Sequence, residues 1–454
     1  MASTDQPPKT DHRLLARLAR NVGWLLGGKG ITALFSLIYL AVAARALGPV
    51  QFGVFMLVLT YAQLIANIVQ FQSWKGVIRF GAVHLAEGRR DQLARVLGFS
   101  AVLDWASALA GALLAAAGAF LVAPLFAWSP GVQHQAAVFA AALLLTTGAT
   151  ASGMLRLFDR FDLLTYSEAC SPTVRLVGAV AAWLAGAGVP AFLTVWALAA
   201  LAQALATWIA AILIRRSRLS IGARSLAGAV RENPGLWRFM WQTSLSSSFG
   251  FLWLQAGTLA VGAYAGPAMA GGFRLADRVA SAIAKPTDTI TRALYPELAR
   301  LVASDDRQTL LTLFRRSIVI SGSLAIVIVL LTASAGHLIL RLIAGKHFEF
   351  AQPFLILLSV AAAINVAGFI LEPFLNAHGR SGRVLRARLV GTVVYVGLLA
   401  ALLPTRGPTG AAIAVAITSA VIIGQLALSA RDILRKGRIG RARPTPAVQS
   451  TVAE

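Results

Sequence analysis

Long apolar runs alternate with short polar connections along almost the whole chain. Each run holds about the 20 residues that a helix needs to cross a hydrocarbon core of about 30 Å. The pattern therefore predicts an all-α integral membrane protein with about twelve transmembrane helices. Their predicted ranges are 22–44, 52–71, 96–123, 135–155, 163–185, 191–214, 240–263, 271–298, 317–337, 351–376, 389–403 and 409–430.

Basic residues fall mainly in every second connection, and this asymmetry sets the orientation of the predicted helices. If odd-numbered helices run outward, the outer loops hold few of the 41 Lys and Arg residues, namely Arg45, Arg341, Lys346 and Arg406. Cytoplasmic loops of membrane proteins carry an excess of these residues, so we predict that both termini are cytoplasmic. Residues 73–95 are predicted to form an amphipathic helix at the cytoplasmic interface.

Composition agrees with a membrane protein and excludes several other classes. Hydrophobic residues make up 57% of the 454 residues and charged residues only 13%, which is not typical of a soluble protein. The net charge of +23 would suit a nucleic-acid-binding protein, but the cations lie between the apolar runs, so no nucleic-acid partner is predicted. The single cysteine, Cys170, allows no intramolecular disulfide, and the scattered histidines lack metal-ligand spacing. We predict no cofactor and no metal site.

An internal repeat divides the chain into two halves. Gly48-Pro49, followed by Gly53, recurs 218 residues later as Gly266-Pro267, followed by Gly271. Six predicted helices separate the copies, and an even number preserves orientation, so the halves should be parallel repeats around a central cavity. We therefore predict a six-helix N-terminal lobe over residues 1–214, a basic cytoplasmic linker over 215–239, and a C-terminal lobe with a basic tail over 240–454.

The predicted helix 271–298 carries the candidate binding site. At about 100° per residue, its four basic residues fall within about 40° of one another. A charge at the membrane centre costs about 2.5 to 3.5 kcal/mol on insertion scales, so this stripe should face an interior cavity and bind an anion. Alternatively, partner helices and Asp277 and Asp288 of the same segment could neutralise it. The basic stripe consists of Arg274, Arg278, Lys285 and Arg292.

Two further features point to the same cavity. Pro286 follows Lys285 directly and should kink the helix near the middle of the membrane, where transporters often place their sites. Asp288 is predicted to line the cavity beside it. On the second predicted helix, amide side chains recur at helical spacing and either line the cavity or hydrogen-bond to neighbouring helices. This amide face consists of Thr60, Gln63, Asn67 and Gln70.

Other charged residues also lie within predicted helices. Lys29 and Asp104 could form a structural pair, and so could Glu168 and Arg175, which are seven residues apart. For Glu168 and Arg175 we favour this structural interpretation.

The run GGKGITALFSLIYLAVAARALGPVQFGVFMLVLTYAQLI, residues 27–65, resembles the opening of Wzx-type polysaccharide biosynthesis flippases. This resemblance implies the fold of the multidrug and oligosaccharidyl-lipid exporter superfamily, in which two six-helix lobes open alternately to either side. It also implies a multi-pass protein of the bacterial inner membrane. The family has no strict short sequence motif. The resemblance therefore implies only one property of the site in this chain, which is a cavity lined by basic residues. The residues that would provide it are Lys29, Arg274, Arg278, Lys285 and Arg292.

The resemblance further implies a substrate, a short oligosaccharide repeat unit on undecaprenyl diphosphate, and places the protein in membrane lipid. Candidate protein partners are the glycan polymerase and the chain-length machinery. No catalytic residue is predicted, since the resemblance implies a secondary transporter and not an enzyme.

Three alternatives remain open at this point. A drug or cation antiporter of the same superfamily would favour carboxylates in the cavity, whereas 271–298 has more cations than buried acids. A membrane glycan polymerase or ligase would need a large outer segment and paired carboxylates, and the longest outer connection is only about residues 338–350. A lipid-linked peptidoglycan precursor flippase fits the charges almost as well.

Overall fold

The computed structural model describes residues 10–126, 128–216, 226–285, 301, 307–378 and 380–436, with most side chains from residue 34 onward. Within these ranges the chain forms α-helices and short 3-10 helices, and it contains no β-strand. The all-α prediction is confirmed. The same residues hold 7 stretches of helix that are long and apolar enough to cross a membrane, two of them 53 residues long. The total of twelve helices and the cytoplasmic termini stay predictions.

Two long elements are each divided by a glycine with non-helical backbone angles. Gly48 in α1 (Thr10–Val69) has φ 67° and ψ 173°, and Gly407 in α15 (Ser381–Lys436) has φ 61° and ψ −150°. Glycine adopts positive φ without the steric cost of a Cβ atom. The proline that follows each glycine is favourable at the first position of a new helix. Each element is therefore two helices, as the paired ranges 22–44 with 52–71 and 389–403 with 409–430 predicted.

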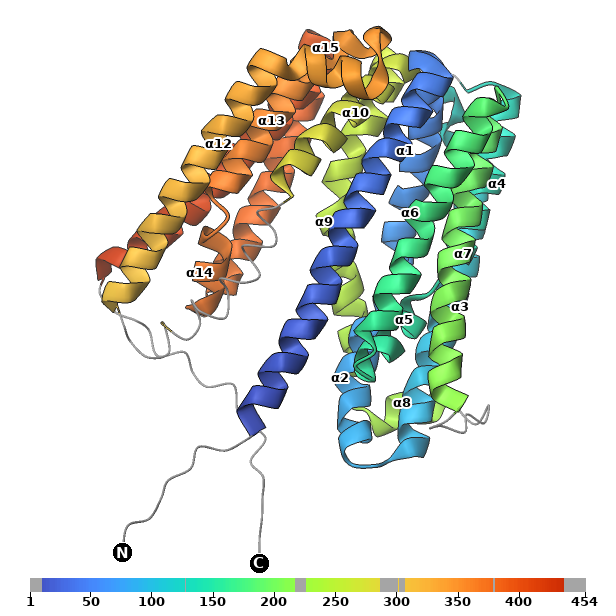
Figure 1. Cartoon of the computed structure of the whole chain (residues 1–454), viewed down its shortest axis with the longest axis vertical. Coiled ribbons are helices and arrows are strands. Elements are labelled where there is room, and N and C mark those ends of the chain that lie inside the picture. Colours follow the sequence, from blue (N-terminus) through green and yellow to red (C-terminus); the bar gives the residue numbers. More distant parts are fainter. Residues whose placement is uncertain are drawn as a thin grey trace, which may run out of the picture. The chain divides into compact units, whose positions relative to one another are not determined.

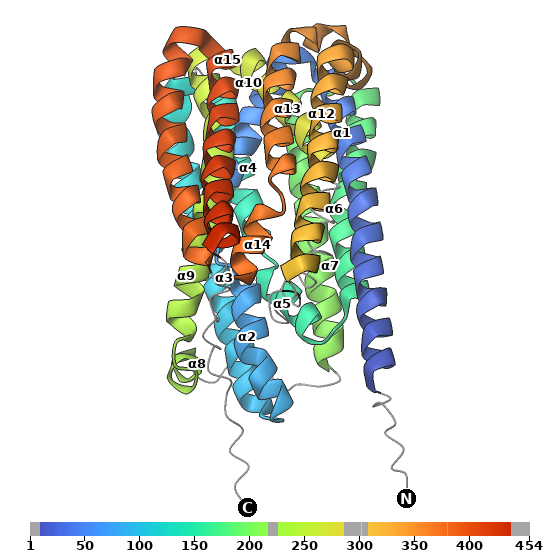
Figure 2. The ribbon, with the colours of Figure 1, turned by 90° about the vertical axis from the view of Figure 1, so that its left-hand side faces the viewer.

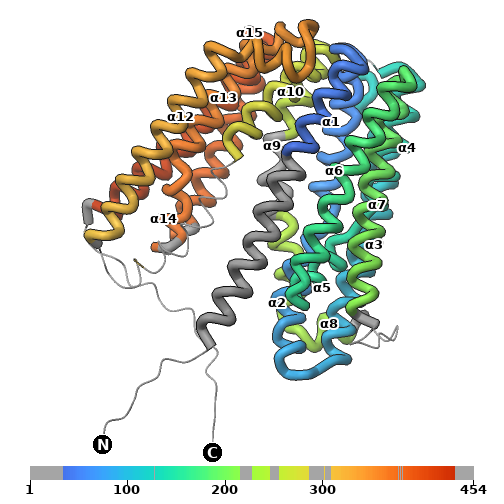
Figure 3. Tube along the Cα trace, viewed as in Figure 1, coloured from blue at the N-terminus to red at the C-terminus, as the bar shows by residue number. Residues whose placement is uncertain are grey.

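Contacts between helices divide the chain into two compact units, and the first comprises residues 1–274 and 341–348. In this unit α6 packs against α1 and α7, and α3 packs against α4 (Figure 1). The short helices α2, α5 and α8 gather at one end of the bundle (Figure 3). Besides α1, its elements are α2 (Ser73–Ala86), α3 (Arg90–Val122), η1 (Ala123–Phe126), α4 (Pro130–Leu145), α5 (Ala149–Leu157), α6 (Phe161–Leu184), α7 (Val189–Arg216), α8 (Leu226–Glu232) and α9 (Leu236–Ala265).

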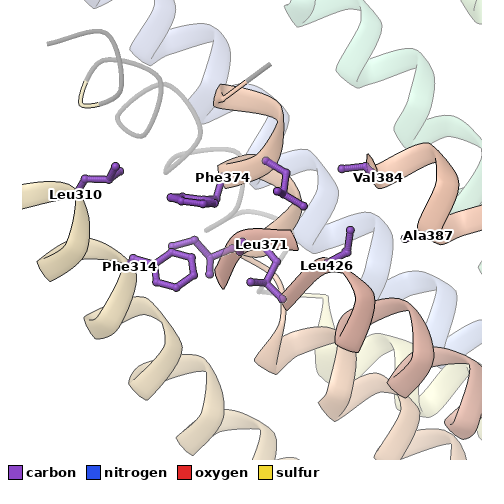
Figure 4. Packing of buried hydrophobic residues seen from close by; sticks show 10 residues of the cluster. Leu310, Phe314, Leu371, Phe374, Val384, Ala387 and Leu426 are labelled. Atoms are coloured by element: carbon purple, nitrogen blue, oxygen red, sulfur yellow. The ribbon is translucent and has the colours of Figure 1, made fainter. Parts of the chain in front are cut away.

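The second unit comprises residues 275–340 and 349–454. It contains most of α10 (Pro267–Ala284) and α12 (Arg307–Ala344), followed by η2 (Lys346–Ala351), α13 (Gln352–Ala367), α14 (Leu371–Ala377) and α15. Figure 2 shows α12 and α13 side by side. A core of buried apolar side chains joins α12, α14 and α15 (Figure 4), with the rings of Phe314 and Phe374 4.9 Å apart.

The described elements repeat in the order that the sequence repeat predicts. Gly266 has φ 83° and ψ 174°, nearly the angles of its counterpart Gly48. The succession α3, η1, α4, α5 recurs as α12, η2, α13, α14. In both copies a predicted single helix is interrupted, between α4 and α5 and again between α13 and α14. The predicted helices 135–155 and 351–376 were continuous, so these interruptions are a correction from the structure.

The compact units do not follow the predicted linker. Their boundary lies within α10, after Arg274, whereas the linker was placed at residues 215–239. Of that linker, residues 217–225 lie outside the described part of the chain. The division into two six-helix lobes therefore stays a prediction.

Large apolar side chains on the outside of both units fit a lipid environment. Leu121 and Leu184 in the first unit are 79% and 81% exposed, and Val393 in the second is 73% exposed. Exposed apolar surface of this extent marks a membrane or protein contact. These side chains occur on helices long enough to cross the bilayer.

Candidate functional site

The first two residues of the basic stripe, Arg274 and Arg278, lie on α10. Pro267 provides the first residue of this helix, and Gly266 before it reverses the chain. Arg274 is buried, with 2% of its surface exposed, whereas Arg278 and Lys285 are exposed. Lys285 follows the last residue of α10, and its amide donates to the carbonyl of Ala282 at 3.4 Å. The residue before a proline disfavours helical angles, which accounts for the end of α10 ahead of Pro286.

Part of the predicted site cannot be placed. Pro286, Asp288 and Arg292 lie outside the described residues, and so does the side chain of Lys29, whose backbone is helical within α1. The helix predicted over 271–298 is confirmed as far as Ala284. Asp277, which the sequence analysis also considered as a neutralising acid, is half-buried on α10.

The amide face of α1 is bonded to two neighbouring helices and to α1 itself. Asn67 Nδ2 donates to the Gln63 carbonyl at 2.8 Å, and Gln70 Nε2 donates to the carbonyl of Leu144 on α4 at 3.3 Å. Gln255 Nε2 on α9 donates to Gln63 Oε1 at 3.4 Å. These bonds give the amides a role in helix packing. Thr60 is buried, and the other three are half-buried. Their lining of a cavity stays a prediction.

Asp104 is a buried carboxylate whose partners lie on two other helices. It lies in α3 with 2% of its surface exposed. Its Oδ2 accepts bonds from the amide and the hydroxyl of Thr150, at 2.8 and 2.7 Å, and its Oδ1 accepts one from the Ser73 hydroxyl. Ser73 is the first residue of α2, and Thr150 is the second residue of α5.

Asp104 therefore lies beside the starts of two helices. A carboxylate is stabilised there by the unsatisfied N–H groups and by the helix dipoles, which explains how it is buried among uncharged donors. The signal in the sequence was present but dispersed, since Ser73 and the Thr146-Thr147-Gly148 break are far from Asp104 along the chain. The described contacts assign Asp104 a structural role in joining α2, α3 and α5.

Glu168 also has a different partner from the one predicted. Its Oε1 lies 3.6 Å from the guanidinium of Arg156 on α5, and the Arg175 guanidinium lies over the Trp196 ring. The prediction that Glu168 pairs with Arg175 is wrong, because Arg175 is two turns further along α6 whereas Arg156 lies on an adjacent helix.

The helix starts that follow the two Gly-Pro turns of the repeat meet within the first unit. A Cβ atom placed on Gly271 would lie 2.9 Å from Gly53 Cα, and one on Gly53 would overlap the carbonyl group of Pro267. Only glycine allows two backbones to approach this closely. Gly53 and Gly271 are equivalent positions of the repeat. Contact between equivalent residues is expected where a pseudo-two-fold axis passes between them.

Residues 341–348, which come late in the chain, also pack against this part of the first unit. The Arg45 guanidinium donates to the carbonyls of Leu342 and Ile343, the latter at 3.2 Å, near the end of α12. The fully buried Phe348 ring meets Phe52 edge-on, with centroids 5.4 Å apart. Cations are favourable at a helix C-terminus, so Arg45 suits these carbonyls.

The comparison with protein families identifies the family of this chain. The family described as polysaccharide biosynthesis protein matches residues 18–302, which is more than half of the chain. The chain belongs to the polysaccharide biosynthesis protein family. The resemblance seen in residues 27–65 is thereby confirmed.

A relative of this family member is the inner membrane protein YghQ of Escherichia coli (strain K12). The two are 29% identical over 339 residues, which cover 73% of this chain and 94% of the relative. With the apolar helices described above, this similarity identifies a multi-pass protein of the bacterial inner membrane. The predicted localisation is confirmed.

Solved structures identify the fold of this polysaccharide biosynthesis protein. An inward-facing multidrug resistance MATE family transporter of the MOP superfamily matches with a TM-score of 0.71 and 14% identity, over 90% of this chain and 96% of that chain. The lipid II flippase MurJ, in an inward closed conformation, matches with a TM-score of 0.68 and 13% identity, over 90% and 88%. The chain has the fold that these transporters share.

Proposed function

We propose that the protein flips a polyprenyl-diphosphate-linked oligosaccharide repeat unit from the inner to the outer leaflet of the inner membrane. The product would supply synthesis of a surface polysaccharide such as O-antigen, capsule or exopolysaccharide. Family membership supports a glycan substrate, and the shared transporter fold supports movement across the membrane without a chemical step. The protein then acts as a secondary transporter and not as an enzyme.

The observation that carries this proposal is the run of cations on and directly after α10. Arg274, Arg278 and Lys285 lie within about 40° of one another at helical spacing. A diphosphate leaving water needs charged hydrogen-bond donors, because an unpaired charge is costly in a medium of low dielectric constant. An antiporter for cationic drugs would need the opposite charge in this place.

A transport path follows from the order of the stripe. Arg292, predicted at the inner end, would meet the diphosphate first, Lys285 would hold it near the midplane, and Arg274 would release it outside. Lys29 would add a further cation, and the amides Gln63 and Asn67 would contact the glycan. The polyprenyl tail can remain in lipid throughout, since only the charged headgroup needs the cavity.

The two predicted lobes would move this headgroup by rocking about the cavity, opening it alternately to each side. The close approach of Gly53 and Gly271 supports this mechanism, because it brings the two predicted outer turns together in one state. An inside-negative potential would favour outward movement of the anion by about 2.3 kcal/mol per net charge per 100 mV.

Deletion of the gene in its native host tests the proposed step. We expect intact repeat units on the lipid carrier to accumulate in the inner leaflet, because translocation is removed while assembly continues. The measurement is analysis of lipid-linked glycans together with their accessibility from outside in spheroplasts. Repeat units that are already outside but unpolymerised would point to a polymerase instead. Accumulation of the lipid-linked peptidoglycan precursor would point to that substrate.

A further inference from the structure

The end of the first unit that holds α2 and α8 carries an excess of cations (Figure 3). Of its acids, Glu232 lies 2.8 Å from Arg95. Glu87 contacts Arg89, and Asp91 is exposed at the start of α3. This end of the unit is therefore positive. The arginines here that form no ion pair with a described residue are Arg79, Arg90, Arg231 and Arg238.

The start of α9 is packed against α2, which fixes the geometry of this end. His84 Nε2 on α2 lies 2.7 Å from Oδ1 of Asn233, just before α9, and the two form a hydrogen bond. Met240 of α9 belongs to a buried apolar cluster against which Phe80 of α2 packs. Phe239 meets the same ring edge-on, with centroids 5.9 Å apart. Two aromatic rings, one from each helix, therefore lie at the junction of α2 and α9.

Arg79 of α2 lies against both of these rings. Its guanidinium carbon is 4.5 Å from the centre of the Phe239 ring and 5.5 Å from that of Phe80. The residue is exposed, and its side chain forms neither a hydrogen bond nor an ion pair with a described residue. A guanidinium placed over aromatic rings keeps the N–H groups around its edge for phosphate oxygens. Arg238, directly before Phe239, adds a second exposed cation.

A row of exposed apolar side chains continues from this junction along α9. Trp237, Trp241 and Leu245 are exposed, and their four-residue spacing places them on one side of the helix. Tryptophan is enriched where a membrane helix passes the lipid headgroups. Leu245 lies about 10 Å further along the helix than Arg238, toward the predicted membrane segment 240–263. A soluble phosphate would not use this row, whereas the acyl chains of a lipid would cover it.

We propose that Arg79 and Arg238 bind the headgroup phosphate of an anionic phospholipid at the junction of α2 and α9. The phosphate oxygens accept hydrogen bonds from the edge of the Arg79 guanidinium, and the acyl chains lie against Trp241 and Leu245. Basic pockets beside membrane helices recognise lipid headgroups in this way. A zwitterionic lipid has the same phosphate, but the surrounding cations repel its ammonium group. The site is separate from the α10 stripe and does not depend on the transported substrate.

Native mass spectrometry of the purified full chain in detergent tests the site. The probes are phosphatidylglycerol and phosphatidylcholine with the same acyl chains, and we expect the wild type to retain phosphatidylglycerol preferentially. Arg79→Gln should weaken phosphatidylglycerol binding about tenfold, because it removes charged hydrogen bonds to the phosphate. Arg79→Lys should restore part of the affinity, since it keeps the charge but not the planar fork. Trp241→Ala should weaken both lipids, because it removes an acyl-chain contact.

Arg90→Gln provides a matched control for diffuse attraction to this positive end. Arg90 is exposed there, but among the described residues its side chain contacts neither an acid nor an aromatic ring. Its replacement should leave phosphatidylglycerol binding unchanged, and a loss equal to that of Arg79→Gln would overturn the site.

Thermal stability of each variant separates lost binding from unfolding. If Arg79→Gln does not fold, Arg79→Lys and Arg238→Gln decide, and each should weaken phosphatidylglycerol binding severalfold. Equal retention of the two lipids by the wild type, or unchanged phosphatidylglycerol binding in the folded variants of Arg79 and Arg238, would show that there is no such site.

Discussion

Replacing Arg278 and Lys285 together by alanine should abolish most transport while leaving the protein folded and inserted. Both side chains are exposed, so their removal leaves no buried partner unpaired. A hydrogen bond to a charged group contributes about 1.5 to 3 kcal/mol, so each single variant should lose about tenfold to about a hundredfold in rate. The double variant should lose more. The measurement is surface polysaccharide in the deletion host, complemented with each variant at equal protein level.

Membrane insertion should not account for this loss. Taking a charge out of a spanning segment eases insertion by about 2.5 to 3.5 kcal/mol at the membrane centre. Arg315→Ala is a suitable control, since this exposed arginine lies near the start of α12 and outside the stripe. It should support normal export. Normal export in the double variant, at normal protein level, would show that the stripe does not handle the substrate.

Gly53→Ala should disfavour the state in which the helix starts after the two Gly-Pro turns touch. The added methyl group would overlap the backbone of Pro267, which cannot move aside as a flexible side chain could. Overpacking of this kind costs about 1 to 3 kcal/mol, so we expect transport to fall by about fivefold to about a hundredfold. Gly271→Ala should have a similar effect because its Cβ would meet the backbone of Gly53.

A thiol crosslink can report this state directly. We would place cysteines at Val50 and Ala268, equivalent positions of the repeat, in a Cys170→Ser background, and join them with a short bifunctional reagent. Gly48 and Gly266 are less suitable because their positive φ angles strain any other residue. Gly53→Ala should reduce the crosslink, whereas Gly98→Ala, which meets open space in α3, should not. If Gly53→Ala changes neither crosslinking nor export, contact between the turns is not part of the cycle.

The sequence predicted those features of the fold that depend on local patterns. Apolar runs of membrane length marked the helices, and a Gly-Pro pair marked the turns at Gly48 and Gly266, where positive φ requires glycine. The alignment of the basic residues along one side of α10 could be predicted from helical geometry alone. These signals lie within a few residues of the structure that they produce. They can therefore be interpreted without knowing which other segments pack against them.

The features that the sequence did not reveal depend on contacts between distant segments. Asp104 could be recognised as a buried ion, but its partners Ser73 and Thr150 are 31 and 46 residues away. Residues 341–348 join the first unit through Arg45, almost 300 positions earlier in the chain, and no periodicity indicates that contact. The stacking of Arg175 on Trp196 was missed for the same reason. Glu168 lies on the same helix and was the obvious partner from spacing alone.

The central claim is that this chain itself moves a lipid-linked oligosaccharide between leaflets. The most direct measurement uses liposomes containing the purified protein, with a fluorescent polyprenyl-diphosphate oligosaccharide in the inner leaflet and an impermeant quencher outside. We predict that the label becomes accessible much faster than in protein-free liposomes, and that the Arg278 and Lys285 double variant loses this difference. A rate equal to that of protein-free liposomes, from correctly folded protein under an inside-negative potential, would contradict the proposed function.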